Sequence, residues 1–242
     1  MKKIITTIAF IAMSTFSAKA FDMEFFSITG GIAANNSVFG ATATQDEYNV
    51  AGTAIDASNR ESGVFTDSFT SQFVELGLGK WLSVGFEHVP DSITTPQNIN
   101  DGGGHRAANN DPTSKVSVDF NDFNTYYAKI NTPIGVYFKF GTVETDLDIK
   151  ETQKSGNKYK NVSTEGSSIG AGYEKSFGDR GIGLRIEANY VELDGVTVNN
   201  GLTKSSGSFT NGGFNEIKAK NLEGLTGKVA LTYTFGRSGN TF

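Results

Sequence analysis

The segment Ile182–Tyr190 restricts the fold of this chain more than any other. Its even positions are apolar and its odd positions are glycine, charged or amide: Ile182, Leu184, Ile186, Ala188 and Tyr190 against Gly183, Arg185, Glu187 and Asn189. Successive side chains of a β-strand point to opposite faces, so a period of two is typical of a strand with one apolar and one polar face. A helix would mix the charged Arg185 with its apolar neighbours. The segment therefore predicts a β-strand.

Shorter alternating segments repeat this pattern along the chain. Together they predict eight strands, near residues 25–36, 69–79, 81–89, 115–130, 135–149, 164–177, 181–195 and 216–235. Short turns at 79–80, 131–133 and 178–181 hold the Gly, Pro, Asn and Asp residues that suit tight turns. Long polar stretches separate the hairpins and are expected to be loops: Ala41–Asp67, Pro90–Lys115, Lys150–Ser163 and Thr197–Asn215. Short and long connections in alternation indicate a meander whose two rims face different spaces.

The N-terminal segment has the form of an export signal. Lys2 and Lys3 precede an apolar run over residues 4–16, and Ala18 and Ala20 place small residues where a signal peptidase reads them. We expect a cleavable signal peptide over residues 1–20 and one barrel domain over residues 21–242. The apolar run is too short for a membrane helix, and no later stretch approaches 18 consecutive apolar residues, which excludes helical membrane spans.

Charge and cysteine content narrow the function classes. Without the three lysines of the signal, the chain carries 18 basic and 26 acidic residues, a net charge of −8. This balance argues against nucleic acid as a partner, because binding phosphate requires clustered Lys and Arg. The absence of cysteine means that an exported chain must be stabilised by burial or by a membrane instead of disulfides. If it spans a membrane, a closed barrel is the only form that satisfies the backbone.

The alternation shows that the two faces of the strands differ, but not which one is inside. A soluble barrel would hide the apolar set, whereas a membrane barrel would turn it toward lipid. The polar set contains both signs of charge, so in a narrow lumen its members could pair with one another. The expected lumen charge network is Glu75, Glu87, Lys129, Lys139, Glu174, Arg185, Glu187 and Lys228.

The end of the chain favours the membrane orientation. Val229, Leu231, Tyr233 and Phe235 alternate with polar or small residues and end in an aromatic. This run resembles the terminal-strand signal of outer-membrane barrels, although seven residues follow Phe235 here. The resemblance implies recognition by the barrel-assembly machinery. Trp81, Phe177 and Phe235 lie beside short turns or the strand end, where aromatic rings suit a membrane–water interface.

The whole mature chain resembles the small eight-stranded barrels of the Gram-negative outer membrane: the OmpA transmembrane domain, OmpX, OmpW and the opacity-type, porin-like proteins. The resemblance implies an all-β, eight-stranded antiparallel up-and-down transmembrane barrel with short periplasmic turns and long extracellular loops. Its mixed-charge lumen is more similar to that of OmpA or OmpX than to the more apolar interior of OmpW. It further implies a monomer that contacts outer-membrane lipid and lipopolysaccharide.

Three functions follow as hypotheses. An eight-stranded barrel is just wide enough to be filled by its own side chains, so we expect a plugged, non-enzymatic surface protein with a structural, adhesion or interaction role through its extracellular loops. The alternative is a narrow porin for ions or small solutes. A lipid-A-modifying enzyme is the third possibility, but the chain has only His88 and His105 as histidine bases, and no nucleophile–base signature. No cofactor or metal site is expected, because no acidic group matches a calcium-loop spacing.

Overall fold

The structure is a computed structural model, and it describes residues 26–49, 51–100, 114–152, 158–178, 181–203 and 214–236. The expected signal peptide lies outside these residues. Within them the chain forms strands β1 (Phe26–Tyr48), β2 (Ile55–Leu78), β3 (Leu82–Val89), β4 (Ile93–Thr94), β5 (Asn98–Asn100), β6 (Ser114–Asn131), β7 (Val136–Thr152), β8 (Val162–Ser176), β9 (Ile182–Leu193), β10 (Val196–Asn199) and β11 (Asn215–Phe235). Within the described residues there is no helix that is long and apolar enough to cross a membrane.

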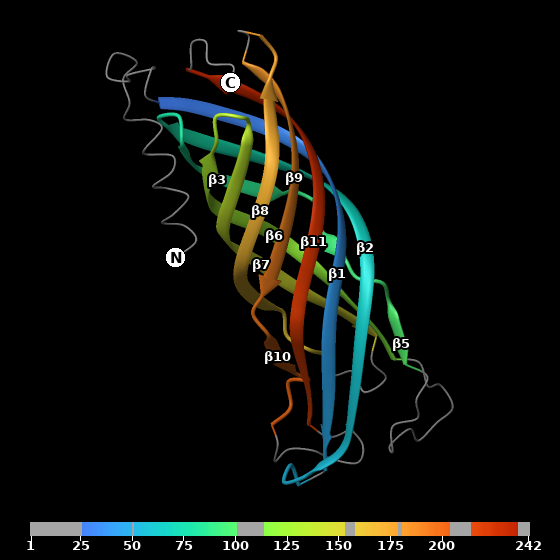
Figure 1. Cartoon of the computed structure of the whole chain (residues 1–242). Helices are drawn as coiled ribbons and strands as arrows, with labels where there is room; N and C mark the ends of the chain where they lie inside the picture. The colour runs from blue at the N-terminus through green and yellow to red at the C-terminus, as the bar shows by residue number, and fades with distance from the viewer. Residues whose placement is uncertain are drawn as a thin grey trace.

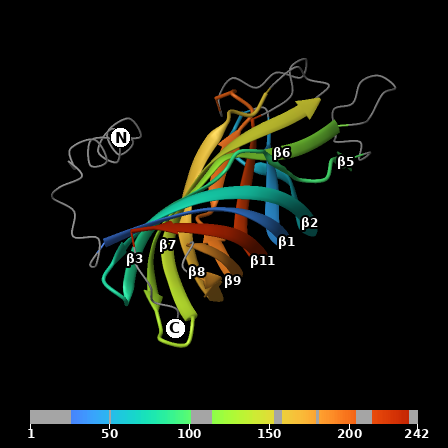
Figure 2. The same cartoon turned by 90° about the horizontal axis from the view of Figure 1, so that it is seen from above.

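Eight of these strands form a closed antiparallel ring. Their order is β1-β2-β3-β6-β7-β8-β9-β11, and β11 pairs back onto β1, while β4 and β5 pair with β6 and β10 pairs with β11. Figures 1 and 2 show the strands crossing the molecule obliquely, with the long curved strands β1, β2 and β11 side by side. The eight-stranded barrel predicted from the sequence is confirmed.

The register of the strands sets the shape of the barrel. Partners followed from Gly30 on β1 through β2, β3 and each later strand lead to Glu223 on β11 and back to β1 at Gly40. The ring therefore closes with a stagger of ten residues. A closed sheet with such a stagger requires strands that are tilted relative to the barrel axis.

We call the end with the short connections the turn end. β2 and β3 are joined there through Gly79 and Lys80, β6 and β7 through Thr132–Gly135, and β8 and β9 through Phe177–Gly181. Gly79 and Gly135 have φ angles of +63° and +85°, a region that glycine enters without steric cost. The chain enters β1 and leaves β11 at this same end (Figure 1).

The opposite end, which we call the extended end, differs from the sequence prediction. The stretch Ala41–Asp67 is not a loop. β1 and β2 stay paired from Phe26 and Leu78 at the turn end to Tyr48 and Ile55 at the extended end, and only a tight turn joins them. This prediction was wrong because a hairpin that is polar on both faces shows no apolar periodicity.

The other three stretches expected to be loops contain strand as well. β7 continues to Thr152 and β8 begins at Val162, while β10 occupies Val196–Asn199. β4 and β5 lie within Pro90–Lys115 and add to the edge of β6. Of the remainder, residues 101–113, 153–157 and 204–213 lie outside the described residues, and the other positions between these strands are described as turn or irregular structure.

The two halves of the barrel bury opposite kinds of side chain. Near the turn end the apolar residues point outward, as shown by Ile186, Leu231 and Phe140, which are 55%, 55% and 51% exposed. The charged residues between them point inward and are buried. Toward the extended end the alternation inverts, and Val143, Val191 and Leu193 become buried while the neighbouring glutamates are outward. A band of outward apolar side chains around a closed ring is the form required for a bilayer, so the barrel spans the membrane with its turn-end half.

Candidate functional site

The interior of the membrane-spanning half holds two charge clusters. The first charge cluster lies nearer the turn end and consists of Glu75, Lys129, Glu174 and Arg185. Arg185 binds Glu75 through both guanidinium nitrogens, Nη1–Oε1 at 2.7 Å and Nη2–Oε2 at 2.8 Å, and Nη2 also contacts Glu174 at 2.8 Å. Lys129 Nζ lies 2.6 Å from Glu75 and 3.1 Å from Glu174. Arg185 is only 1% exposed, so this fork-shaped pairing is desolvated and fixed in geometry.

The second charge cluster lies next to the first on the side of the extended end, and it consists of Glu87, Lys139, Glu187 and Lys228. Lys139 Nζ contacts Glu187 at 2.7 Å and Glu87 at 3.1 Å. Lys228 bridges the same two carboxylates, with 3.1 Å to Glu187. Ser71 donates its hydroxyl to Glu87 Oε1 at 2.8 Å. Each carboxylate therefore has two cations, and each cation has two carboxylates.

Two tyrosines lock the clusters together. The Tyr127 hydroxyl donates a hydrogen bond to Glu75 of the first charge cluster at 2.8 Å. The centroid of the Tyr127 ring lies 4.5 Å from Lys139 Nζ of the second charge cluster. Tyr137 donates to Glu187 of the second charge cluster at 2.6 Å, and its ring faces Arg185 at 5.2 Å. The ring of each tyrosine thus makes a cation–π contact with one cluster, and its hydroxyl donates a hydrogen bond to the other.

An apolar layer covers the charge clusters on the side of the extended end. It consists of Val143, Val191, Leu193 and Leu222, and Phe120 and Phe123 pack against it. Two β-bulges shape the wall at this level, at Asp122 on β6 and Asn221 on β11, where positive φ angles of 49° and 53° accompany register shifts. Along the barrel axis, the interior therefore changes from paired charges to packed apolar side chains before the extended end.

The charges of the two clusters balance. The two clusters contain four carboxylates and four cations, all paired within the lumen. No cluster of three or more potential metal ligands occurs among the described residues. Within the same residues only Arg185 Nε and Asn189 Oδ1 are buried lumen side-chain atoms without a hydrogen-bond partner. The charged groups of the two clusters form ion pairs that hold the strands together, and none of these eight groups is a free base or nucleophile.

A smaller ionic group lies near the tip of the β1–β2 hairpin. Asp46 accepts a hydrogen bond from the Ser58 hydroxyl at 2.7 Å and contacts Lys218 Nζ at 3.0 Å. The Ser58 hydroxyl, followed by Lys218, holds the pKa of Asp46 below its ordinary value of 3.8. Glu216 and Asp46 together raise the pKa of Lys218. This group links β1, β2 and β11 well beyond the apolar band.

The residues expected at the membrane interface lie on the outer surface. Val229, Leu231, Tyr233 and Phe235 point outward with exposures of 52% to 61%. Trp81 and Phe177 are 58% and 51% exposed beside the connections of the turn end. These positions suit rings at a membrane–water boundary, and recognition of the last strand by assembly machinery stays a prediction.

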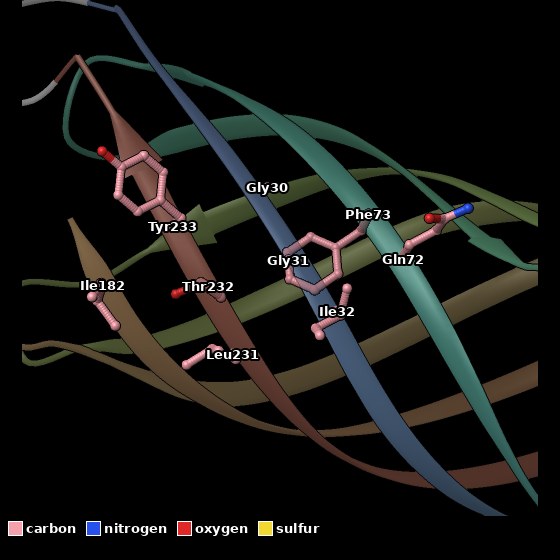
Figure 3. A pocket seen from close by; sticks show the side chains of 9 residues that line it. All are labelled: Gly30, Gly31, Ile32, Gln72, Phe73, Ile182, Leu231, Thr232 and Tyr233. Carbon is pink, nitrogen blue, oxygen red and sulfur yellow. The ribbon is translucent and has the colours of Figure 1, made fainter.

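Of the two histidines, the structure describes only His88. His88 points outward, with its Nδ1 2.8 Å from Asn124 Oδ1 and its ring stacked 6.4 Å from that of Phe86. His105 lies outside the described residues. A hollow on the outer wall is lined by Gly30, Ile32, Leu231, Tyr233 and their neighbours (Figure 3). It arises because Gly30 lacks a side chain, and its walls are mainly apolar.

The sequence prediction omitted several residues that complete the lumen. Tyr127, Tyr137 and Ser71 share the inward positions of the charged residues, so the alternation that located Lys129 and Lys139 also contained them. The apolar layer was missed for a different reason. Its residues on β9 occupy the same inward phase as Arg185 and Glu187, but beyond Asn189 the inward positions change from polar to apolar, and the sequence prediction expected a polar inward face throughout.

Comparisons with known proteins give structural neighbours but no sequence relative. No family profile and no curated protein matches the chain. Among solved structures it is similar to OprG from Pseudomonas aeruginosa, with 10% identity, a TM-score of 0.47, and coverage of 85% of this chain and 96% of OprG. It is also similar to AlkL determined in lipid bilayers (11% identity, TM-score 0.45, 94% and 99% covered). A third is Ail, the attachment invasion locus protein of Yersinia pestis (10%, 0.35, 84% and 99%).

These neighbours are outer-membrane proteins. The geometry of this chain by itself, with a closed ring, an outward apolar band and a charged interior, is that of a transmembrane β-barrel.

Proposed function

We propose that this protein is a non-enzymatic, non-conducting barrel of the bacterial outer membrane that presents a tall β-sheet wall outside the cell. One observation carries the proposal. The membrane-spanning lumen holds the two charge clusters and, beyond them, the apolar layer, and we expect these side chains to leave no continuous polar path along its axis. Eight-stranded barrels have interiors that side chains can fill completely.

The extended end is the part available to partners. β1, β2 and β11 remain paired to the hairpin tip, with Glu47 opposite Ala57 on one side and Asn215 on the other. A paired sheet holds its side chains more rigidly than a loop does, and interaction sites on rigid scaffolds lose less entropy on binding. Contact with lipopolysaccharide and other surface molecules through this wall is part of the proposal, as is a monomeric state.

Single-channel recording tests the plug against a narrow porin. The purified, refolded protein in planar bilayers is expected to be silent at moderate voltage. A double variant, Glu87→Ala with Lys228→Ala, removes a paired charge from the second charge cluster without leaving a net charge, and Leu222→Ser makes the apolar layer polar. Combining the three substitutions is expected to produce measurable conductance. Steady conductance of the unmodified protein would replace the proposal by the porin alternative.

Surface labelling tests the orientation. The chain has no cysteine, so a single cysteine introduced at Thr53, in the turn between β1 and β2, is the only reactive thiol. A membrane-impermeant maleimide is expected to label this variant in intact cells. A matched cysteine at Lys80, in the β2–β3 turn, is expected to react only after the outer membrane is permeabilised. The reverse result would contradict the proposed placement of the extended end.

A further inference from the structure

The apolar band on the outer surface does not have the same height around the barrel. We count outward side chains on each strand from the turn end. On β2 the first three are Leu78, Leu76 and Val74, and the fourth is Gln72. On β3 the fourth is His88, and on β6 it is Asn124. These three strands are neighbours in the ring, and Gln72, His88 and Asn124 are partners in one cross-strand row.

The opposite side of the barrel keeps its apolar band for longer. The fourth outward residue is Val229 on β11 and Ala188 on β9, and the apolar run continues to Leu225 and Tyr190 before Glu223 and Glu192. Each outward side chain on a tilted strand adds about 5 Å of depth. The band is therefore ~15 Å high on β2, β3 and β6 and ~25–30 Å high on β9 and β11, against the ~25 Å usual for such barrels.

The polar side chains that end the apolar band on β2, β3 and β6 point outward. Figure 3 shows the Gln72 amide directed away from the Phe73 ring, which lies over Gly31. His88 and Asn124 are joined by their 2.8 Å contact. An amide and an imidazole facing hydrocarbon would each lose hydrogen bonds to water, at a cost of a few kcal/mol on the scale for buried polar groups.

The backbone gives the same boundary independently. Within the described residues, the ladder between β2 and β3 ends at the pair Gln72–His88, while β2 continues for seventeen further residues to Ile55. The strands next along the chain, β4 and β5, pair with β6 instead of β2. Unpaired backbone N–H and C=O groups are not tolerated against lipid. The edge of β2 above Gln72 therefore requires water.

A tilted barrel does not explain this difference. Tilting would move the band toward one end on one side and toward the other end on the opposite side, without changing its height. Here the apolar runs of β2 and β11 both begin at the turn end, with Leu78 and Phe235, and differ in where they stop.

We infer that β2, β3 and β6 hold a locally thinned bilayer, in which lipid headgroups and water descend to Gln72, His88 and Asn124. The partner of this surface is the headgroup region of the leaflet on the extended side. On β9 and β11 the same leaflet keeps its ordinary thickness, so the protein stands at a step in the membrane surface.

Spin-label depth measurements test the inference directly. Single cysteines at Gln72 and Val229, both fourth outward residues, carry a nitroxide in the full-length mature protein reconstituted in dimyristoyl-phosphatidylcholine vesicles. The label at 72 is expected to collide mainly with a water-soluble nickel chelate, and the label at 229 mainly with oxygen. Labels at Val74 and Leu231, both third, are expected to lie in hydrocarbon on either side. Equal depths at 72 and 229 would overturn the inference.

A second measurement covers the loss of the native Gln72 side chain in the labelled protein. The combined variant Gln72→Leu, His88→Leu and Asn124→Leu raises the apolar band on the short side by one outward position. The unmodified protein is expected to unfold at a higher temperature in dilauroyl- than in dipalmitoyl-phosphatidylcholine vesicles, and the combined variant is expected to reduce this difference. Val74→Leu is the matched control and is expected to leave it unchanged. An unchanged difference in the combined variant would contradict the role of these three side chains.

Discussion

The membrane-spanning half and the extended half of this barrel use the same strands with opposite alternation. On β9, Ile186 is outward and Glu187 inward, and a few residues later Val191 is inward and Glu192 outward. The backbone continues without interruption across this change. Whether lipid or water surrounds a strand therefore determines which of its faces is apolar. The backbone hydrogen bonds between the strands are the same in both surroundings.

The two halves also differ in what stabilises their interiors. In the membrane-spanning half the charged groups are paired at 2.6 to 3.1 Å and are almost without exposure, except for Glu174, whose side chain is 19% exposed. In the extended half the interior begins with the apolar layer, and ion pairs lie at the surface, where Lys150 is 64% exposed in its pair with Asp119. An ion pair should therefore contribute very differently to the free energy of unfolding in the two halves.

The largest expected effect breaks the first charge cluster. Arg185→Ala leaves Glu75 and Glu174 with Lys129 alone, and removing one partner of a buried pair costs ~3–5 kcal/mol. Lys150→Ala, the matched change in the extended half, is expected to cost at most ~1 kcal/mol. Urea unfolding in lipid vesicles, followed by the fluorescence of Trp81, the single tryptophan, measures both. Similar losses for the two variants would remove the energetic distinction between the halves.

The sequence predicted the membrane-spanning half well because lipid and lumen impose contrast. Every second residue of β9 faces hydrocarbon, so Arg185 and Glu187 stand out against Ile182 to Tyr190, and the eight residues expected in the lumen are all found there. What the alternation could not give is which carboxylate meets which cation. That depends on the ten-residue stagger, which brings Glu75 of β2 to Arg185 of β9 across the ring.

The extended half was predicted poorly because its two faces lack contrast. Thr42 lies opposite Ser62 on the paired β1–β2 hairpin, and their hydroxyls bond at 2.9 Å. A strand wetted on both sides carries no periodic apolar signal, so it is indistinguishable from a polar loop by sequence. A usable signal existed only where apolar residues return on the inward face, as at Val191 and Leu193.

A medium effect comes from the tight packing around the charge clusters. A Cβ at Gly172 would lie 2.3 Å from the Tyr137 hydroxyl and 2.6 Å from the backbone oxygen of Ile186, whereas one at Gly30 would meet nothing within 4 Å. Gly172→Ala is expected to cost ~1–3 kcal/mol by overpacking. Gly30→Ala, on the lipid side, is expected to stay within about 0.5 kcal/mol. The same urea unfolding measures both, and equal effects would mean that the lumen can relax around an added methyl group.

The smallest expected effect concerns Asp46 at the hairpin tip, where solvent screens the charges. The Ser58 hydroxyl and Lys218 favour the carboxylate, so the pKa of Asp46 in the folded protein lies below 3.8. Its contribution to stability is complete above the ordinary pKa and is lost as pH falls through the folded one. Carbon NMR of the Asp46 carboxyl in micelles is expected to show this low midpoint, and Ser58→Ala and Lys218→Met are each expected to raise it. Lys150→Met, whose ammonium pairs with Asp119, is the control. An unmoved midpoint in both Asp46-partner variants would show that the tip is too mobile to hold the pairing, and would confine ordered electrostatics to the membrane-spanning half.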